Sequence, residues 1–409
     1  MSSPFGEGAL ESARLFCVVA FVSLAGCSSS APDSAAQPQS PDSNNNAAAA
    51  SRLAELGEKI FNDPSLSSSG LLSCASCHDK DHAFAGADGL AAPLGGALSA
   101  DSGFRNTPAL TYLQSTPAFH FDSEGTPIGG FNRDGRAKDF AEQAVRPFLT
   151  SFEMGNESQE SVVEKIRRAP YAEELRQFFG AQSLDDPTAA FFDIREALQA
   201  FEQENPQFQS FTSKYDYFLA GKVKLNEQEL RGLALFNSPV KGNCAACHPS
   251  TRGADGSAPL FTDFTYDNLG VPRNYDIPVN QDPSYFDLGL CGPAREDLAD
   301  RKDLCGAFKV PSLRNVGITA PYFHNGKFNT LREVVSFYVR RDTHPEEWYP
   351  LDVNGEPRKF DDLPRELAGN VNTTELPYNR KRGDEPALSS DEIDDVVAFL
   401  QTLTDGYTL

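Results

Sequence analysis

The stretch Cys74-Ala75-Ser76-Cys77-His78 decides the fold, and it recurs as Cys244-Ala245-Ala246-Cys247-His248. Two thiols three residues apart can each form a thioether with a haem vinyl group, while the adjacent imidazole reaches the iron. The chain has only 8 Cys and 6 His in 409 residues, so two such motifs are not expected by chance. We therefore predict two covalent haem c groups, with His78 and His248 as iron ligands.

The alternatives for these motifs are a zinc knuckle and a redox-active pair of cysteines. A zinc knuckle requires further Cys or His pairs nearby, and a redox pair is typical of a thioredoxin-like setting. The sequence has neither feature, so haem attachment is favoured.

Length and motif separation predict two domains. A chain of 409 residues exceeds what one core usually supports, and the motifs lie 170 residues apart (244 minus 74). We expect an N-terminal haem domain over residues 51–221 and a C-terminal haem domain over residues 222–409. Helical periodicity dominates and strand-like alternation is scarce, which predicts a mainly α protein: two cytochrome c-like helical haem domains with long loops.

In a capping box, the side chain of the N-cap residue and the side chain three positions later each bond the other residue's backbone amide. Four such pairs predict helix starts. The pairs are Ser161 with Glu164, Asn226 with Glu229, Thr330 with Glu333 and Ser389 with Glu392. Leu53, Leu56 and Ile60 lie on one face of a further predicted helix, just before the first haem motif.

Residues 1–26 have the features of a lipoprotein signal peptide. An apolar run from Leu15 to Ala25 is too short to span a bilayer, and Leu24-Ala25-Gly26-Cys27 resembles a lipobox. Cys27 is thus the predicted lipidation site, with an ordinary signal peptide as the alternative. Residues 27–50 lack aromatic residues, and this composition predicts a disordered tether. We expect a periplasmic protein that is anchored to a membrane by lipid.

Cys291 and Cys305 are the only other thiols once Cys17 leaves with the predicted signal peptide. In an exported protein such a pair is expected to form a disulfide, and two free thiols are the alternative.

The formal net charge is −22 and the pI is about 4.7. Nucleic-acid binding is not expected, because contact with phosphates requires a basic surface. An acidic surface could attract a basic redox partner, and the alternative is that it only keeps the protein soluble.

Four further motifs follow one another along the chain. They are Phe131-Asn132-Arg133-Asp134-Gly135-Arg136, Glu142-Gln143-Ala144, Phe152-Glu153-Met154 and Pro311-Ser312-Leu313-Arg314-Asn315-Val316. With the two haem motifs, they make the chain from about Leu53 to Leu403 resemble bacterial di-haem cytochrome c peroxidases and MauG-like enzymes. The resemblance implies two cytochrome c-like domains with a calcium ion between them.

The same resemblance implies roles for individual residues. His78 would hold a peroxidatic N-terminal haem, and His248 an electron-transferring C-terminal haem. Gln143 and Glu153 match residues on the peroxide side of the first haem. Glu153 suits acid/base work, because peroxide heterolysis moves a proton from the inner to the outer oxygen. Outside this motif, a solvated carboxylate would be the default interpretation.

Asn106, Thr319 and Pro321 match the calcium ligands of the family. One side-chain amide oxygen and two backbone carbonyls suit a hard cation that keeps several waters. Without the resemblance, Asn106 would be interpreted as a turn residue.

The chain departs from the family pattern in three places. Residues 83–106 contain no His that could cap the resting peroxidatic iron, so we expect activity without prior reduction. Arg133 stands where many members have a Trp that relays electrons between the haems. The only methionines are Met1 and Met154, so the usual distal Met of the second domain is absent.

Tyr338 is the predicted sixth ligand of the second haem iron. It lies 14 residues after His324 (338 minus 324), where peroxidases of the family carry Met and MauG-like members carry Tyr. Leu331, Val335 and Tyr338 also share one face of a predicted helix. The alternative is a core tyrosine whose hydroxyl bonds elsewhere.

These features predict a peroxide-dependent di-haem oxidoreductase. It would reduce hydrogen peroxide at the N-terminal haem, with electrons passed through the C-terminal haem from a cytochrome c or another donor. A second possibility is a MauG-like oxidase that modifies side chains of a partner protein. A third is a non-catalytic electron carrier, which would leave Gln143 and Glu153 without a purpose.

Overall fold

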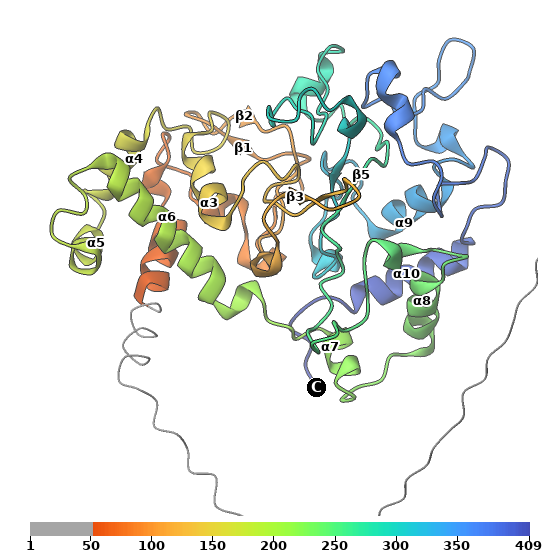
Figure 1. Ribbon diagram of the computed structural model, residues 1–409, viewed down its shortest axis with the longest axis horizontal. Helices are drawn as coiled ribbons and strands as arrows, with labels where there is room; N and C mark the ends of the chain where they lie inside the picture. The colour runs from red at the N-terminus through yellow and green to blue at the C-terminus, as the bar shows by residue number, and fades with distance from the viewer. Residues whose placement is uncertain (1–51) are drawn as a thin grey trace, which may run out of the picture. The chain divides into compact units, whose positions relative to one another are not determined.

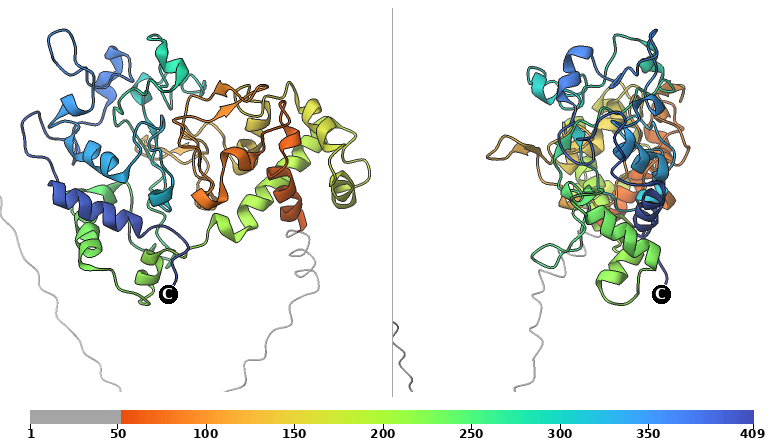
Figure 2. Two further views of the ribbon diagram at one scale, coloured as in Figure 1. Left: turned by 180° about the vertical axis from the view of Figure 1, so that it is seen from behind. Right: turned by 90° about the vertical axis from the view of Figure 1, so that its right-hand side faces the viewer.

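The computed structural model describes residues 52–409. The predicted signal peptide, Cys27 and the tether lie outside the described residues. Helices and long loops make up most of the ribbon, with short strand pairs between them (Figures 1 and 2). The prediction of a mainly α protein is therefore confirmed. Within residues 52–409, no helix combines the length and the apolar character needed to cross a membrane.

The helices and strands have the following bounds. The α-helices are residues 52–61, α2 Cys74–Cys77, α3 Phe140–Leu149, α4 Gln159–Ile166, α5 Ala172–Phe179, α6 Pro187–Glu204, α7 Lys214–Leu219, α8 Glu227–Asn237, α9 Leu331–Arg340 and α10 Ser390–Gln401. The antiparallel strand pairs are β1 Leu94–Gly95 with β2 Asp101–Ser102, β3 His120–Phe121 with β4 Pro127–Ile128, and β5 Tyr266–Asp267 with β6 Phe308–Lys309. Short 3₁₀ turns include η1 Pro64–Leu66 and η5 Cys244–Ala246.

Two large hydrophobic cores lie in different halves of the chain. The first is built from residues between Leu56 and Phe208, and the second from residues between Tyr215 and Leu403. The helix over residues 52–61 crosses α6 in the first core, and α8 crosses α10 in the second. Figure 1 shows α8 and α10 side by side.

A glycine allows each of these helix pairs to come into close contact. A Cβ atom added to Gly57 would lie 1.9 Å from the carbonyl oxygen of Ala197, and one added to Gly232 would lie 1.9 Å from that of Asp395. Only glycine permits backbones to approach this closely. The two halves are therefore built around the same kind of helix crossing.

Three of the predicted helix starts are confirmed. Asn226, Thr330 and Ser389 are the N-caps of α8, α9 and α10, and each forms its predicted capping box. The predicted start at Ser161 is wrong. The hydroxyl of Ser158 accepts a hydrogen bond from the Ser161 amide at 3.2 Å, so α4 begins earlier and Ser161 is its third residue.

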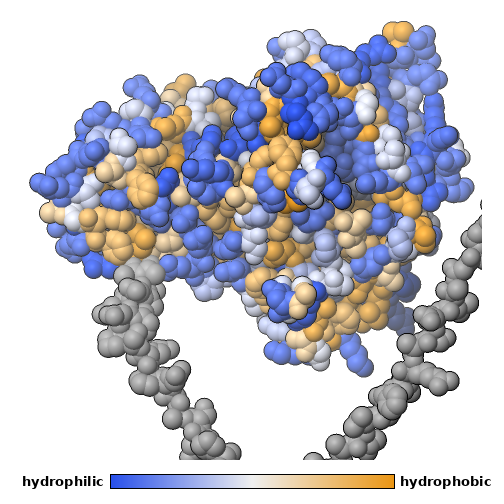
Figure 3. Space-filling model, in the orientation of Figure 1, coloured by the Kyte–Doolittle hydropathy of each residue, from blue (hydrophilic) through white to orange (hydrophobic). Residues whose placement is uncertain are grey.

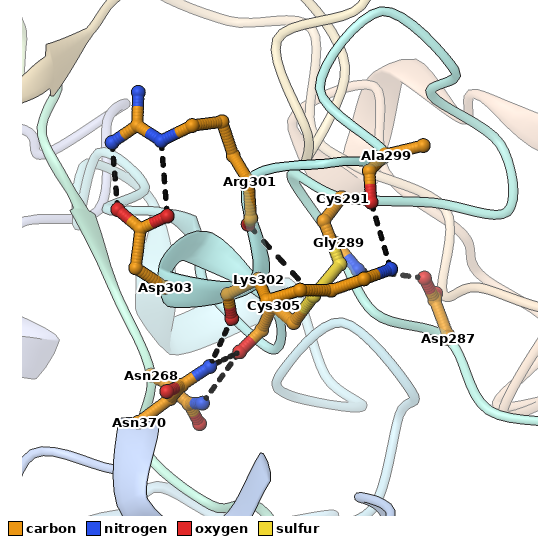
Figure 4. Close-up of a disulfide and its surroundings, with 10 residues drawn as sticks. All are labelled: Asn268, Asp287, Gly289, Cys291, Ala299, Arg301, Lys302, Asp303, Cys305 and Asn370. Atoms are coloured by element: carbon orange, nitrogen blue, oxygen red, sulfur yellow. Dashed lines mark hydrogen bonds and ion pairs between the residues drawn. A yellow bond between two sulfur atoms is a disulfide. The ribbon is translucent and has the colours of Figure 1, made fainter.

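A disulfide joins Cys291 to Cys305 within the long loop of the second half, and their Cα atoms are 4.9 Å apart. The side chains of Asn268 and Asn370 each donate a hydrogen bond to the carbonyl oxygen of Cys305 at 3.1 Å (Figure 4). The loop is thereby fixed to two other segments of the same half. Hydrophilic residues are spread over much of the face in Figure 3, in keeping with the net charge of −22.

Candidate haem sites

The first haem motif forms α2 and presents His78 in a defined state. The Nδ1 atom of His78 lies 2.8 Å from the backbone carbonyl oxygen of Phe84. Because a carbonyl oxygen only accepts, Nδ1 carries the proton and Nε2 presents a lone pair. Burial lowers the pKa of His78, which favours the neutral imidazole that binds iron.

The second motif repeats this arrangement. The Nδ1 atom of His248 lies 2.7 Å from the carbonyl oxygen of Phe261, and burial again lowers the pKa of the imidazole. Phe84 and Phe261 both have left-handed backbones, with φ of 56° and 55°. In each turn, the carbonyl oxygen therefore contacts the histidine in the same way, and both histidines are suited to act as iron ligands.

The four motif cysteines stand in pairs beside these imidazoles. None of them forms a disulfide, and all are partly buried. Burial raises the pKa of Cys77 to about 11, and that of both Cys244 and Cys247 to about 12. Both pairs of thiols remain available for thioether attachment of haem.

A cavity of about 330 Å³ lies beside the second motif. Cys244, Cys247, His248 and Tyr338 all contribute to its walls. The remaining lining is largely apolar and includes Phe236, Phe264, Val271, Leu313, Leu331, Val335 and Leu388. An apolar cavity with an imidazole and a phenol in its walls fits a flat macrocycle around an iron atom.

Tyr338 lies in α9 with its ring among other aromatic rings. The centroids of Phe323 and Tyr378 are 5.8 and 6.0 Å from that of Tyr338. Its hydroxyl forms no hydrogen bond with any residue in the range 52–409, so the alternative of a core tyrosine bonded elsewhere is not observed there. Burial raises the pKa of Tyr338, and the charge of Asp267 adds to this effect.

Two partly buried cations in the cavity wall also fit a haem. Arg133 and Lys309 line the cavity, and neither forms an ion pair with a described carboxylate. Burial lowers the pKa of Arg133 to about 10 and that of Lys309 to about 8. A buried charge without a counter-ion is costly. The carboxylates of haem propionates would supply the missing negative charge.

The structure places the two predicted catalytic residues near different parts of this region. Gln143, in α3, lines the cavity. Glu153 lies near the first motif, since its charge raises the pKa of Cys77. Burial raises the pKa of Glu153, whereas a hydrogen bond involving Thr150 and the charge of Arg136 lower it by a smaller amount. Among the described residues, no hydrogen bond joins Gln143 directly to Glu153.

The three predicted calcium ligands, Asn106, Thr319 and Pro321, all line the cavity. The Oδ1 atom of Asn106, however, accepts a hydrogen bond from Nη2 of Arg133 at 2.8 Å. A calcium ion beside a guanidinium would be repelled, so this donor set does not fit calcium as it stands.

Pro147 is the residue of α3 that corresponds to Tyr338, and the sequence did not single it out. The N-caps of α3 and α9, Asp139 and Thr330, are 191 residues apart (330 minus 139), and the isolated bridges before them repeat at the same spacing. Tyr338 therefore corresponds to Pro147 (338 minus 147 is also 191). Proline has no side-chain donor for iron, so the two helices differ at this position. The internal repeat was the available signal.

Glu202, in α6, was also missed. It is 3% exposed, and its Oε2 atom has no hydrogen-bond partner among the described residues. Burial raises the pKa of Glu202 to about 8, and its charge raises the pKa of Cys74. A second buried carboxyl group therefore lies near the first motif, and no local sequence pattern marked it.

The comparisons with known proteins agree with this geometry. Residues 51–224 match the family described as di-haem cytochrome c peroxidase. MauG from Paracoccus denitrificans (strain Pd 1222) is 37% identical, over 86% of this chain and 88% of its own length. Cytochrome c551 peroxidase from Nitrosomonas europaea is 31% identical, over 69% of this chain and 71% of its own.

A crystal structure of the diheme peroxidase BthA from Burkholderia thailandensis E264 is also similar, with a TM-score of 0.78, 41% identity and 86% coverage of each chain. The chain therefore belongs to the family of di-haem cytochrome c peroxidases and MauG proteins. It is a di-haem oxidoreductase with a cytochrome c-like fold, and the predicted resemblance is confirmed.

Proposed function

We propose that this protein reduces hydrogen peroxide at a haem held by Cys74, Cys77 and His78, with electrons passed through a haem held near His248. The observation that carries this assignment is an asymmetry. Both halves present the histidine alike, but only the second half places a tyrosine at the helix position that corresponds to Pro147. The first haem site is thereby left with a side open to peroxide. Bound haem supplies the iron that exchanges electrons with peroxide and donor.

Glu153 is the proposed proton carrier. Reduction of hydrogen peroxide to two waters consumes two electrons and two protons, and a proton must move to the leaving oxygen. Burial raises the pKa of Glu153, so the carboxyl group holds a proton at higher pH than an exposed glutamate does. Gln143 is proposed to orient peroxide by hydrogen bonding because it matches the family motif, although the described cavity that it lines lies beside the second motif.

Tyr338 is the proposed sixth ligand of the second haem iron. A phenolate oxygen is a hard anionic donor, so it favours oxidised iron and lowers the reduction potential. Such a haem is better suited to storing an oxidising equivalent than to accepting electrons at high potential.

A second candidate function is the oxidation of side chains on a partner protein. Two observations favour it: the hydroxyl of Tyr338 has no hydrogen-bond partner among residues 52–409, and the chain is 37% identical to a MauG protein.

In the peroxidase reaction, by contrast, the electron donor would be a cytochrome c or another small reductant.

We further propose a periplasmic location with a lipid anchor at Cys27, and haem domains over residues 51–221 and 222–409. The two separate cores support a division into two domains, although Tyr215, Phe218 and Leu219 already pack in the second core. Calcium at Asn106 is not included, because the bond from Arg133 disfavours it.

The test is a haem count combined with rapid mixing. We expect two haems per chain that resist extraction with acid acetone, and a fast change of the haem absorption spectrum when the oxidised protein meets peroxide. Peroxide consumption should then require an added reductant or a protein substrate. A protein with two haems that ignores peroxide would be an electron carrier, and the proposal would fail.

A further inference from the structure

Arg133 departs from the family pattern in its identity and in its contact with Asn106. A Trp often stands at this position, and the amide oxygen of Asn106 is expected to bind calcium. Here Nη2 of Arg133 donates to Oδ1 of Asn106 at 2.8 Å, and Nε donates to the backbone oxygen of the same residue at 3.1 Å. Two hydrogen bonds from one planar group hold Asn106 in a fixed orientation.

Asn106 is also tied to the second half of the chain. Its backbone N–H donates to the carbonyl oxygen of His324 at 2.8 Å. The backbone oxygen of Arg133 accepts a hydrogen bond from the amide of Lys309 at 2.8 Å. Arg133 and Asn106 together therefore link first-half residues to both the 319–324 segment and β6. A calcium ion held by Asn106, Thr319 and Pro321 would make a similar link.

The neighbouring carboxylates are already paired with other cations. Both oxygens of Asp287 accept from Arg105, at 2.6 and 2.7 Å. Asp134 accepts from Arg105 at 2.6 Å and from Arg136 at 2.9 and 3.0 Å. Arg133 contacts neither carboxylate, so its charge is not neutralised by the protein. A divalent cation on Oδ1 of Asn106 would lie directly beside the Arg133 guanidinium that already bonds this oxygen, and the two would repel each other.

We propose that the guanidinium of Arg133 occupies the amide oxygen of Asn106 in place of a calcium ion, so that the two halves are joined at this point by backbone hydrogen bonds and require no metal. The guanidinium is cationic at neutral pH, as arginine is in proteins. Removal of calcium from the medium should leave such a link intact. This inference holds for either candidate function, because it concerns how the sites are held rather than what they react with.

The first test uses the wild-type protein with both haems attached. After dialysis against EGTA, and separately after dialysis against calcium chloride, we would measure calcium by mass spectrometry and record the EPR spectrum and the thermal unfolding midpoint. We expect no stoichiometric calcium in either sample, and identical spectra and midpoints. One tightly bound calcium per chain, or an EPR spectrum that changes with EGTA, would overturn the proposal.

The second test exchanges the cation. Arg133→Trp removes the guanidinium and restores the residue common in the family, and we expect this variant to bind one calcium per chain and to respond to EGTA. Arg133→Lys keeps a positive charge and should remain free of calcium. If Arg133→Trp holds two haems but binds no calcium, Arg133 is not what excludes the metal and the assignment is wrong. Should Arg133→Trp fail to fold, Arg133→Gln replaces it with the same expected outcomes.

Discussion

The two halves of the chain hold their haem motifs alike, yet they differ at one helix position. His78 and His248 each direct Nδ1 to a carbonyl oxygen, at 2.8 and 2.7 Å, and each half closes its core with a glycine at a helix crossing. Where α9 carries Tyr338, α3 carries Pro147. The repeated architecture thus presents a histidine to each predicted haem in the same way, and we predict that this one helix position decides whether the opposite side of the iron is closed.

The surroundings of the two motifs differ as well. Two carboxyl groups, the partly buried Glu153 and the buried Glu202, lie near the first motif and raise the pKa of its thiols. Two tyrosines, the partly buried Tyr338 and the buried Tyr378, lie near the second. A carboxyl group with a raised pKa can both take up and release a proton near neutral pH, whereas a phenol stays protonated there. The difference suits a reactive first site and a closed second site.

The strongest way to break this comparison is to give the first half the residue of the second. Pro147→Tyr should place a phenol beside the first haem and abolish peroxide reduction, with a second low-spin signal in the EPR spectrum. Pro147→Ala is the control, because it removes the proline without adding a donor and should retain activity. Full activity in Pro147→Tyr would contradict the correspondence between α3 and α9.

The reverse change should open the second site. Tyr338→Phe removes the proposed ligand oxygen while keeping the ring, so the low-spin EPR signal of the resting protein should disappear and a high-spin signal should gain its intensity. Tyr378→Phe is a matched control, since its ring centroid lies 6.0 Å from that of Tyr338 in the same cavity wall. An unaltered spectrum in Tyr338→Phe would exclude it as the ligand.

The carboxyl group of the first site should control proton delivery. Glu153→Gln should slow the reaction with peroxide by about 10²-fold with haem content unchanged, because general acid/base transfer contributes about that much. To move a proton from the inner to the outer oxygen, Glu153 must first accept it, so the carboxylate is the active form. Because the pKa of Glu153 is raised, the wild-type rate should rise as the pH rises through that pKa. Stopped-flow mixing at several pH values measures both effects. Glu142→Gln, an equivalent change in α3, should leave rate and pH profile as in the wild type.

The smallest expected effect concerns the shared architecture. Gly57→Ala and Gly232→Ala should each lower the free energy of unfolding by about 1–3 kcal/mol, because the added Cβ would meet a carbonyl oxygen. Gly369→Ala is the control, since a Cβ there has no atom within 4 Å. Denaturant unfolding measures all three. Similar losses at the two crossings would sharpen the comparison, and a loss at only one would show that the halves are not equivalent.

Features confined to short stretches of chain could be predicted from the sequence. The haem motifs, the capping boxes at Asn226, Thr330 and Ser389, and the mainly α character all depend on residues a few positions apart. The start of α4 was misplaced because two serines three residues apart compete as caps, and only the folded backbone selects Ser158. The family resemblance rested on the order of such short motifs along the chain.

Contacts between distant segments could not be predicted in this way. The sequence by itself determined which residues can attach and ligate haem, since thiols and imidazole stand together in five residues. Only the tertiary structure decided that Arg133 takes the oxygen of Asn106, and that Glu202 is buried beside Cys74. These contacts depend on how helices pack and on which charges are left unpaired, and neither property is encoded in the spacing of residues along one segment.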